Sequence, residues 1–135
     1  MIEFAFNKER RVLLVSFRLD ITTQTLDTLD LALAALVSEH GPTDTIIDFS
    51  DAGEVDRSGL VQRRNTAGRR PGKRRIFVAP TSLHYGMFRL YGAHHENRGD
   101  TPPEITPTLA DALAAMGIGP SGFEAIRPKR SRDCA

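Results

Sequence analysis

Short apolar runs alternate with helical patterns along most of the chain, and this alternation is the feature that most limits the fold. Two apolar runs, 2–6 and 12–17, come first, and the polar residues between them predict a hairpin. Further strands are expected at 45–49, at 76–79 and around Ile105, with helical patterns between them. Strands that alternate with helices pair mainly in parallel, through right-handed crossovers. The sequence therefore predicts an α/β fold with a mixed, mainly parallel sheet, an N-terminal hairpin and about four helices.

The four helices are expected where apolar residues recur at three- and four-residue spacing. Side chains suited to N-capping stand at the start of the first, second and fourth of them, and glycine follows the first and the last. A polar link is expected over 92–103. The expected helices run from Thr22 to His40, from Asp56 or Ser58 to about Ala67, from Ser82 to Tyr91, and from Thr108 to Met116.

A length of 135 residues is enough for one domain, which we expect over residues 1–119. Two prolines, a glycine and several bases follow Gly119. Because such a composition buries little apolar surface, residues 120–135 are expected to form a basic, disordered tail.

Composition argues against several classes of protein. Hydrophobic residues make up 40% and charged residues 26% of the chain, as is typical of folded domains. No apolar run approaches the roughly 20 residues of a membrane span, and the first residues lack the features of a secretory signal. A cytoplasmic location is therefore expected. Cys134 is the only cysteine, so it has no partner for a disulfide within the chain.

Charge is divided unevenly along the sequence. Residues 1–56 carry four bases and eleven acids, a net charge of −7, whereas residues 57–135 carry fourteen bases and six acids, a net charge of +8. Such a division either gives a dipolar surface that orients a charged partner, or is evened out when the fold interleaves the two parts.

The segment 46–60 combines a strand, a turn and the start of a helix. Its apolar strand 46–50 (IIDFS) contains Asp48, a turn follows, and 55–60 (VDRSGL) opens the second expected helix at Ser58. This arrangement resembles the central signature of STAS domains, the fold of bacterial anti-sigma factor antagonists. In that family a buried strand ending in Asp is followed by a loop and an Asp-Ser-Ser-Gly-Leu turn.

The order of the other elements agrees with this family over about residues 2–118, and 106–113 (TPTLADAL) resembles its closing helix. Arg57 stands where the family usually has Ser, and a basic run follows Leu60 in place of small and apolar residues. The chain is thus similar to a divergent bacterial branch, the SpoIIAA-like proteins. The resemblance implies a non-enzymatic regulatory module that binds a protein partner, such as a kinase of the anti-sigma factor type. No cofactor is expected.

Two interpretations of Ser58 stay open. In the resembled family the serine beside the glycine is phosphorylated by a partner kinase that is also the anti-sigma factor, and phosphorylation releases the complex. A helix N-terminus stabilises negative charge, so a phosphate on Ser58 would be tolerated there. The alternative is that Ser58 merely caps the helix. Asp48 either supports that site electrostatically or ends its strand with hydrogen bonds to the next loop. The candidate partner surface consists of Asp51, Glu54, Asp56, Arg57, Ser58 and Gly59.

A basic run from Arg57 to Arg75 holds eight bases and no acid. It could bind the phosphates of nucleic acid or of an acidic lipid surface, or it could be a solvated face that compensates the acidic first part of the chain. Because no aromatic residue is interleaved for base stacking, nucleic acid is the less favoured partner. The candidate anion-binding residues are Arg63, Arg64, Arg69, Arg70 and Lys73.

Four aromatic residues, Phe77, Tyr85, Phe88 and Tyr91, are expected in the core. SpoIIAA-like relatives also resemble lipid-transfer folds, so the resemblance keeps open a pocket for a small apolar ligand. A second copy of the chain is a further candidate partner.

Enzymatic and metal-binding functions find little support in the sequence. His94 and His95 are adjacent and, with His84, lack the spacing of a helical metal site. The chain also lacks a phosphate-binding glycine motif, a Gly-x-Ser-x-Gly elbow and a cysteine nucleophile. We therefore expect a protein that is not an enzyme and binds no metal.

Overall fold

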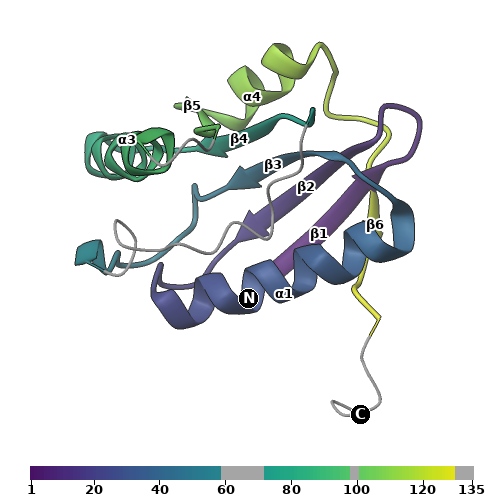
Figure 1. Ribbon diagram of the computed structural model, residues 1–135. Coiled ribbons are helices and arrows are strands. Elements are labelled where there is room, and N and C mark those ends of the chain that lie inside the picture. Colours follow the sequence, from purple (N-terminus) through teal and green to yellow (C-terminus); the bar gives the residue numbers. More distant parts are fainter. Residues whose placement is uncertain (59–71, 98–100, 130–135) are drawn as a thin grey trace.

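A mixed β-sheet with helices on both faces organises the chain (Figure 1). The computed structural model describes residues 1–58, 72–97 and 101–129. The elements in these residues are β1 (Ile2–Asn7), β2 (Val12–Phe17), α1 (Thr23–His40), β3 (Asp44–Asp48), β4 (Arg75–Val78), α3 (Ser82–Asn97), β5 (Glu104–Thr106), α4 (Leu109–Met116) and β6 (Glu124–Ile126).

The strand order across the sheet is β5-β4-β3-β2-β1-β6. The strands from β2 to β5 pair in parallel, whereas β1 pairs antiparallel with β2 on one side and with β6 on the other. The predicted α/β fold, with a mixed, mainly parallel sheet and an N-terminal hairpin, is confirmed.

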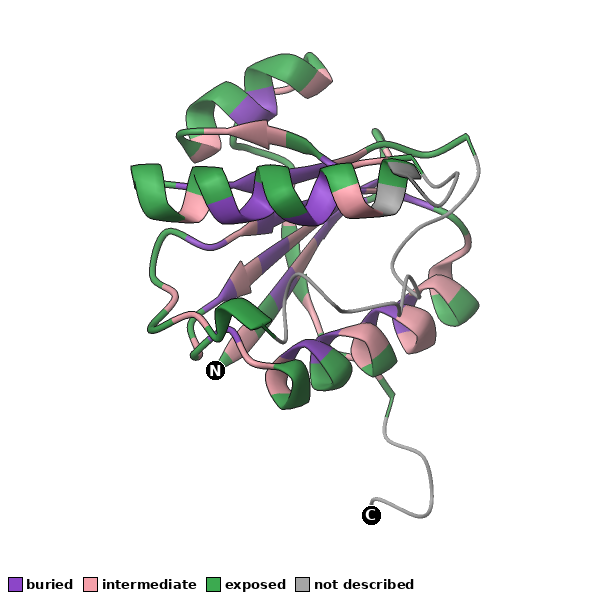
Figure 2. Ribbon diagram, turned by 60° about the vertical axis from the view of Figure 1, so that its left-hand side comes forward, coloured by how far each residue is buried: buried purple, intermediate pink, exposed green. Residues whose placement is uncertain are grey.

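Helices α1 and α3 lie on the same face of the sheet, and α4 lies on the other (Figure 1). Both α1 and α3 connect parallel strands that advance across the sheet in the same direction, so right-handed crossovers put them on one face. Their buried residues face the sheet, while their exposed residues point away from it (Figure 2). Strand β3 is covered on both faces, because Ile47 packs on the side of α1 and Ile46 on the side of α4.

Both ends of α1 agree with the sequence expectation. Thr22 is the N-cap, and it forms a reciprocal capping box with Thr25. Gly41 ends the helix at a φ of 86°, and its N–H donates to the carbonyl of Val37 at 2.8 Å. Arg11, from the hairpin, also donates to the carbonyl of His40. The helix is therefore fixed at both ends, which positions the segment that precedes it.

Helix α3 is longer than predicted, because it continues through Gly92 to Asn97, where a polar link was expected. Gly92 is buried, and a Cβ added to it would lie 3.2 Å from Cβ of Pro102. The glycine therefore permits close packing of the helix on a neighbouring segment and does not end the helix.

The C-terminal segment also differs from the prediction. Residues 120–135 were expected to form a disordered tail outside a domain of residues 1–119, but Glu124–Ile126 forms β6 and pairs with β1. The apolar side chains of Phe123 and Ile126 pack on the two core clusters, which supplies the burial that the composition seemed to lack. Helices α1, α3 and α4 lie in the described residues, and the remaining expected helix, from Asp56 or Ser58 to about Ala67, falls mostly outside them.

Candidate functional site

The loop from Phe49 to Asp56 begins where β3 ends, at the edge of the sheet where the parallel strands have their carboxyl ends. Loops at this edge are the usual binding sites of open α/β sheets. Asp48 accepts a hydrogen bond from the backbone N–H of Ser50 at 2.9 Å and another from its hydroxyl. Asp48 therefore ends its strand with hydrogen bonds to the next loop, which is the second of the two interpretations considered for it.

Backbone hydrogen bonds fasten this loop to the segment that leads into α1. The N–H of Gly53 donates to Leu19 at 3.0 Å, the N–H of Ile21 donates to Glu54 at 2.7 Å, and the N–H of Asp56 donates to Ile21 at 2.8 Å. Ile21 is fully buried beneath the loop. The loop is therefore exposed along most of its length and is tied to the neighbouring segment by three backbone hydrogen bonds.

Asp20 packs closely against Gly53 in this loop. The Asp20 carboxylate accepts the backbone N–H of Glu54 at 2.9 Å. A Cβ added to Gly53 would lie only 2.0 Å from Oδ1 of Asp20. Position 53 therefore requires glycine for as long as Asp20 keeps its hydrogen bond.

Acidic side chains surround the loop. Asp20, Asp51, Glu54 and Asp56 are all exposed. Arg18 lies 3.0 Å from Glu3 and 3.7 Å from Asp51, and its side chain is about half exposed, so these ion pairs contribute little to stability. The described surface around the loop carries more acids than bases, which favours a partner with basic side chains.

Ser58 follows directly on this loop, is exposed and lies in the first helical residues after it. It shares one exposed stretch of sequence with four other members of the predicted partner surface, namely Asp51, Glu54, Asp56 and Arg57. Gly59, the last member, lies outside the described residues.

Most of the candidate anion-binding residues also lie outside the described residues, namely Arg63, Arg64, Arg69 and Arg70. Lys73 is described and is exposed. Arg74 is engaged within the fold: it binds both carboxylate oxygens of Glu104, at 2.8 and 2.6 Å, and donates to the carbonyl of Ala115. The hydrogen bond with Glu104 raises the pKa of Arg74. Arg74 therefore ties β4 to β5 and α4 and is not presented to a ligand.

Sequence analysis missed the contribution of Arg18, Asp20 and Ile21 to this site. Nothing in their local pattern indicates that they contact a loop more than 30 residues away. The only signal is that Asp20 and Ile21 directly precede the Thr-rich start of α1, so the path of the chain into the helix is fixed there.

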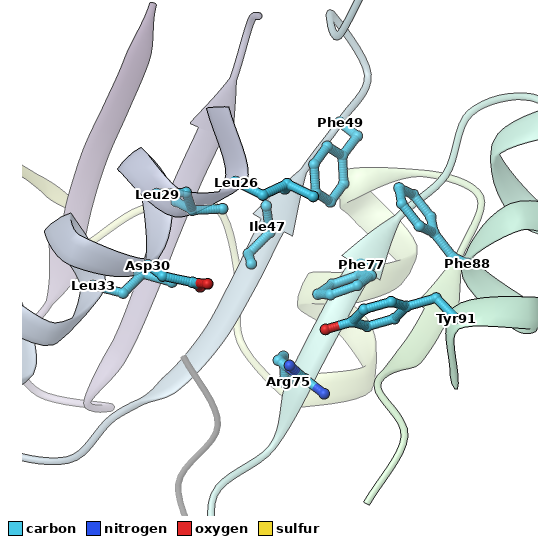
Figure 3. A pocket seen from close by; sticks show the side chains of 10 residues that line it. All are labelled: Leu26, Leu29, Asp30, Leu33, Ile47, Phe49, Arg75, Phe77, Phe88 and Tyr91. Carbon is cyan, nitrogen blue, oxygen red and sulfur yellow. The ribbon is translucent and has the colours of Figure 1, made fainter. Parts of the chain in front are cut away.

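A small cavity lies between α1 and α3, above β3 and β4 (Figure 3). Phe49, Phe77, Phe88 and Tyr91 are among its lining residues, and Figure 3 shows Asp30 and Arg75 at the end away from Phe49. Its volume is about 30 Å³. An apolar cavity that takes up benzene measures about 150 Å³, so this space is too small for the apolar ligand considered above.

Three of the four aromatic residues expected in the core are buried there. The rings of Phe77 and Phe88 lie 5.2 Å apart, and those of Phe77 and Tyr91 lie 6.0 Å apart. Tyr85 is instead 43% exposed and lines a wider, open groove between α3 and residues 102–105. Because Arg89 and Glu96 also line that groove, it is not an apolar pocket.

The histidines show no metal site in the part of the chain that the structure describes, since no three His, Cys, Asp or Glu side chains are grouped there to hold an ion. His84 is bound to Thr81, with Nδ1 and Oγ1 at 2.8 Å, and burial lowers its pKa. No helix within the described ranges is both long and apolar enough to cross a membrane.

Comparison with known proteins finds similarity in structure. No protein-family model matches the chain, and no curated protein matches it either. A solved structure of the anti-sigma factor antagonist SpoIIAA in its unphosphorylated form is similar, with a TM-score of 0.52 and 13% sequence identity. The match covers 78% of this chain and 88% of SpoIIAA. The chain therefore has the STAS-like fold of SpoIIAA, as the motif around Ser58 predicted.

Proposed function

We propose that the chain is a non-enzymatic regulatory module that docks a protein partner through the loop Phe49–Asp56 and the adjacent Ser58. The likeness of its fold to SpoIIAA, an anti-sigma factor antagonist, supports this proposal. A kinase of the anti-sigma factor type is the partner class that the resemblance implies.

The observation that carries the proposal is an exposed loop held rigidly by backbone hydrogen bonds. Exposed loops usually lose conformational freedom when a partner binds, which weakens binding. Here backbone hydrogen bonds already restrict the loop. Gly53 is bonded to Leu19, and both Glu54 and Asp56 are bonded to Ile21. A partner would therefore meet a preformed surface.

Phosphorylation of Ser58 would switch this surface. A phosphate adds about −1.5 to −2 charges near neutral pH. The added charge would fall beside Asp56 and Glu54, which are already acidic and exposed. Where the partner packs directly on Ser58, the bulk and the desolvation cost of the phosphate would prevent docking, even though basic side chains of the partner face the neighbouring acids. The helix start itself would still accommodate the phosphate.

Quantitative capture experiments test the switch. The purified chain and its Ser58→Ala and Ser58→Glu variants are immobilised and exposed to lysate of the source organism, and bound proteins are measured by mass spectrometry. Ser38→Glu is the matched control, because Ser38 is also exposed but lies near the far end of α1. We expect the native chain, Ser58→Ala and Ser38→Glu to retain one partner that Ser58→Glu loses.

Phosphate transfer gives a second readout. The captured partner and ATP, added to the native chain, should place phosphate on Ser58 and leave Ser58→Ala unmodified. If all four proteins captured the same partners, the proposal that phosphorylation of Ser58 controls docking would be wrong.

A further inference from the structure

The outer edge of β1 is covered by a short segment that we call the C-terminal strap, residues 118–129. Its strand β6 pairs along only half of β1: Phe4 lies opposite Ile126, Ala5 opposite Ala125, and Phe6 opposite Glu124. Strand β1 itself has six residues and pairs with β2 along its full length. The strap therefore closes an edge that would otherwise be long and regular.

Apart from its pairing with β1, the strap is held by half-buried side chains, since none of residues 118–129 is fully buried. Ile118 and Phe123 pack beside the core cluster under α4, and Ile126 packs beside the cluster under α1. Lys129 pairs with Glu39 at 3.7 Å, but its side chain is 82% exposed, so that pair adds little. Glu124 and Ala125 are exposed. Segments with so few buried contacts open at low free energy.

The hydrogen-bonding groups on this edge can be assigned from the pairing on the other side. The carbonyl of Met1 accepts the N–H of Arg18 at 2.9 Å, so Met1 faces β2. Because successive residues of a strand point their backbone groups to opposite sides, Ile2, Phe4 and Phe6 present theirs to the outer edge. Strand β6 lies opposite Phe4 and Phe6 but does not reach Ile2.

We infer that the strap guards an interaction edge, and that β1 of a second copy of this chain takes the place of β6 when the strap leaves. Antiparallel pairing with Phe4 opposite Phe4 of the second copy also sets Ile2 opposite Phe6. Each β1 then has all three of its outward-facing residues paired, whereas β6 pairs two of them. The dimer holds three such pairs in all and two strapped copies hold four, so the dimer forms only after the strap has left. A two-fold axis through Phe4 makes this contact closed, so it gives a dimer and not a fibre.

This inference does not rest on the proposed function, because the contact runs along the outer edge of β1 and involves no residue of the Ser58 loop. Exposed edge strands of β-sheets commonly pair with a strand of another chain, and the inference agrees with this behaviour.

Two neighbouring prolines test the inference in the full-length chain. Glu124 lies opposite Phe6, whose backbone groups point outward, so the backbone N–H of Glu124 pairs with β1. Glu124→Pro removes this N–H. The backbone N–H of Ala125 points away from β1, so Ala125→Pro removes an N–H that does not pair with β1. The side chains at both positions are exposed. Ile126→Pro is a second variant of the first kind.

Light scattering after size-exclusion chromatography gives the mass of each variant at equal concentration. We expect Glu124→Pro and Ile126→Pro to show twice the mass of the chain, and Ala125→Pro to behave as the native chain does. Adding Ile2→Pro to Glu124→Pro should reduce the dimer, because the outward-facing backbone N–H of Ile2 is paired only in the dimer. Unchanged mass in both strap variants, or aggregates without a discrete dimer, would overturn the inference.

Discussion

Two glycines show how differently single residues constrain this fold. Gly53 lies in the docking loop, where an added Cβ would collide with the Asp20 carboxylate at 2.0 Å. Gly86 lies inside α3, and an added Cβ there would meet nothing within 4 Å. The first glycine is required by close packing, whereas the second only adds conformational freedom to the unfolded chain.

Replacing each glycine by alanine should therefore change stability in opposite directions. Gly53→Ala displaces Asp20 from the N–H of Glu54, and we expect it to lower the free energy of unfolding by about 1 kcal/mol. Gly86→Ala should raise that free energy by about 0.5–1 kcal/mol, because alanine is the better helix former. Urea denaturation of both variants measures the two values. A shift of the same sign in both would contradict the role given to Asp20.

At the scale of elements, α1 depends on its caps. Thr22 accepts the N–H of Thr25 at 3.1 Å, and Thr25 in turn accepts the N–H of Thr22 at 2.9 Å. The same helix contains Thr28, which is exposed and whose hydroxyl donates to the carbonyl of Gln24. That bond adds little, because the carbonyl is already engaged in the helix.

Thr22→Ala should thus cost stability that Thr28→Ala does not. We expect Thr22→Ala to lower the free energy of unfolding by about 1 kcal/mol, the usual value for loss of an N-cap. Thr28→Ala should leave it unchanged or raise it slightly, since alanine has the higher helix propensity. Thermal unfolding followed by circular dichroism compares the two. If both variants lost the same free energy of unfolding, the capping box would not contribute to the stability of the helix.

Sequence periodicity predicted the elements whose ends are chemically marked, and failed where distant contacts decide. The start of α1 at Thr22 and its end at Gly41 follow from local capping chemistry. Gly92 misled the prediction, because it serves packing against Pro102 from another segment. Strand β6 was missed because its partner, β1, lies about 120 residues earlier and leaves no local signal.

The candidate site divides in the same way. Local pattern predicted a helix that starts at Asp56 or Ser58, and the structure has helix at Arg57 and Ser58, both of which are exposed. The contacts of Asp20 and Ile21 with the loop could not be predicted, because they follow from the arrangement of neighbouring strands in the sheet.

At the scale of the whole molecule, the fold interleaves the two oppositely charged parts of the sequence. Arg11, Asp44, Arg74 and Glu104 follow one another across the amino ends of four parallel strands, with alternating sign. The backbone N–H of Arg74 donates to the Asp44 carboxylate at 2.8 Å, and its guanidinium binds Glu104. Asp44 from the acidic part therefore lies beside Arg74 from the basic part at this edge, and Glu39 pairs with Lys129 elsewhere, while acidic groups stay exposed at the opposite edge.

Two groups, Glu104 and His84, make the stability of the whole molecule depend on pH, each in its own pH range. The hydrogen bond from Arg74 lowers the pKa of Glu104 below its ordinary value of 4.5, so its stabilising contribution is complete above 4.5 and is lost as pH falls through the lowered pKa. Burial lowers the pKa of His84 below 6.5, so the neutral form is favoured in the folded state. Its contribution is complete above 6.5 and disappears as pH falls through that lower value.

Single variants should separate the two ranges. His84→Gln should flatten the dependence of unfolding free energy on pH just below 6.5 and leave the more acidic range unchanged. Glu104→Gln should do the reverse, with a small effect because the Glu104 side chain is 47% exposed and solvent screens the pair. Urea denaturation at a series of pH values measures both curves. If the two variants flattened the same range, the assignment of these groups to separate pH ranges would be wrong, and the acid sensitivity of the molecule would have to arise from another set of side chains.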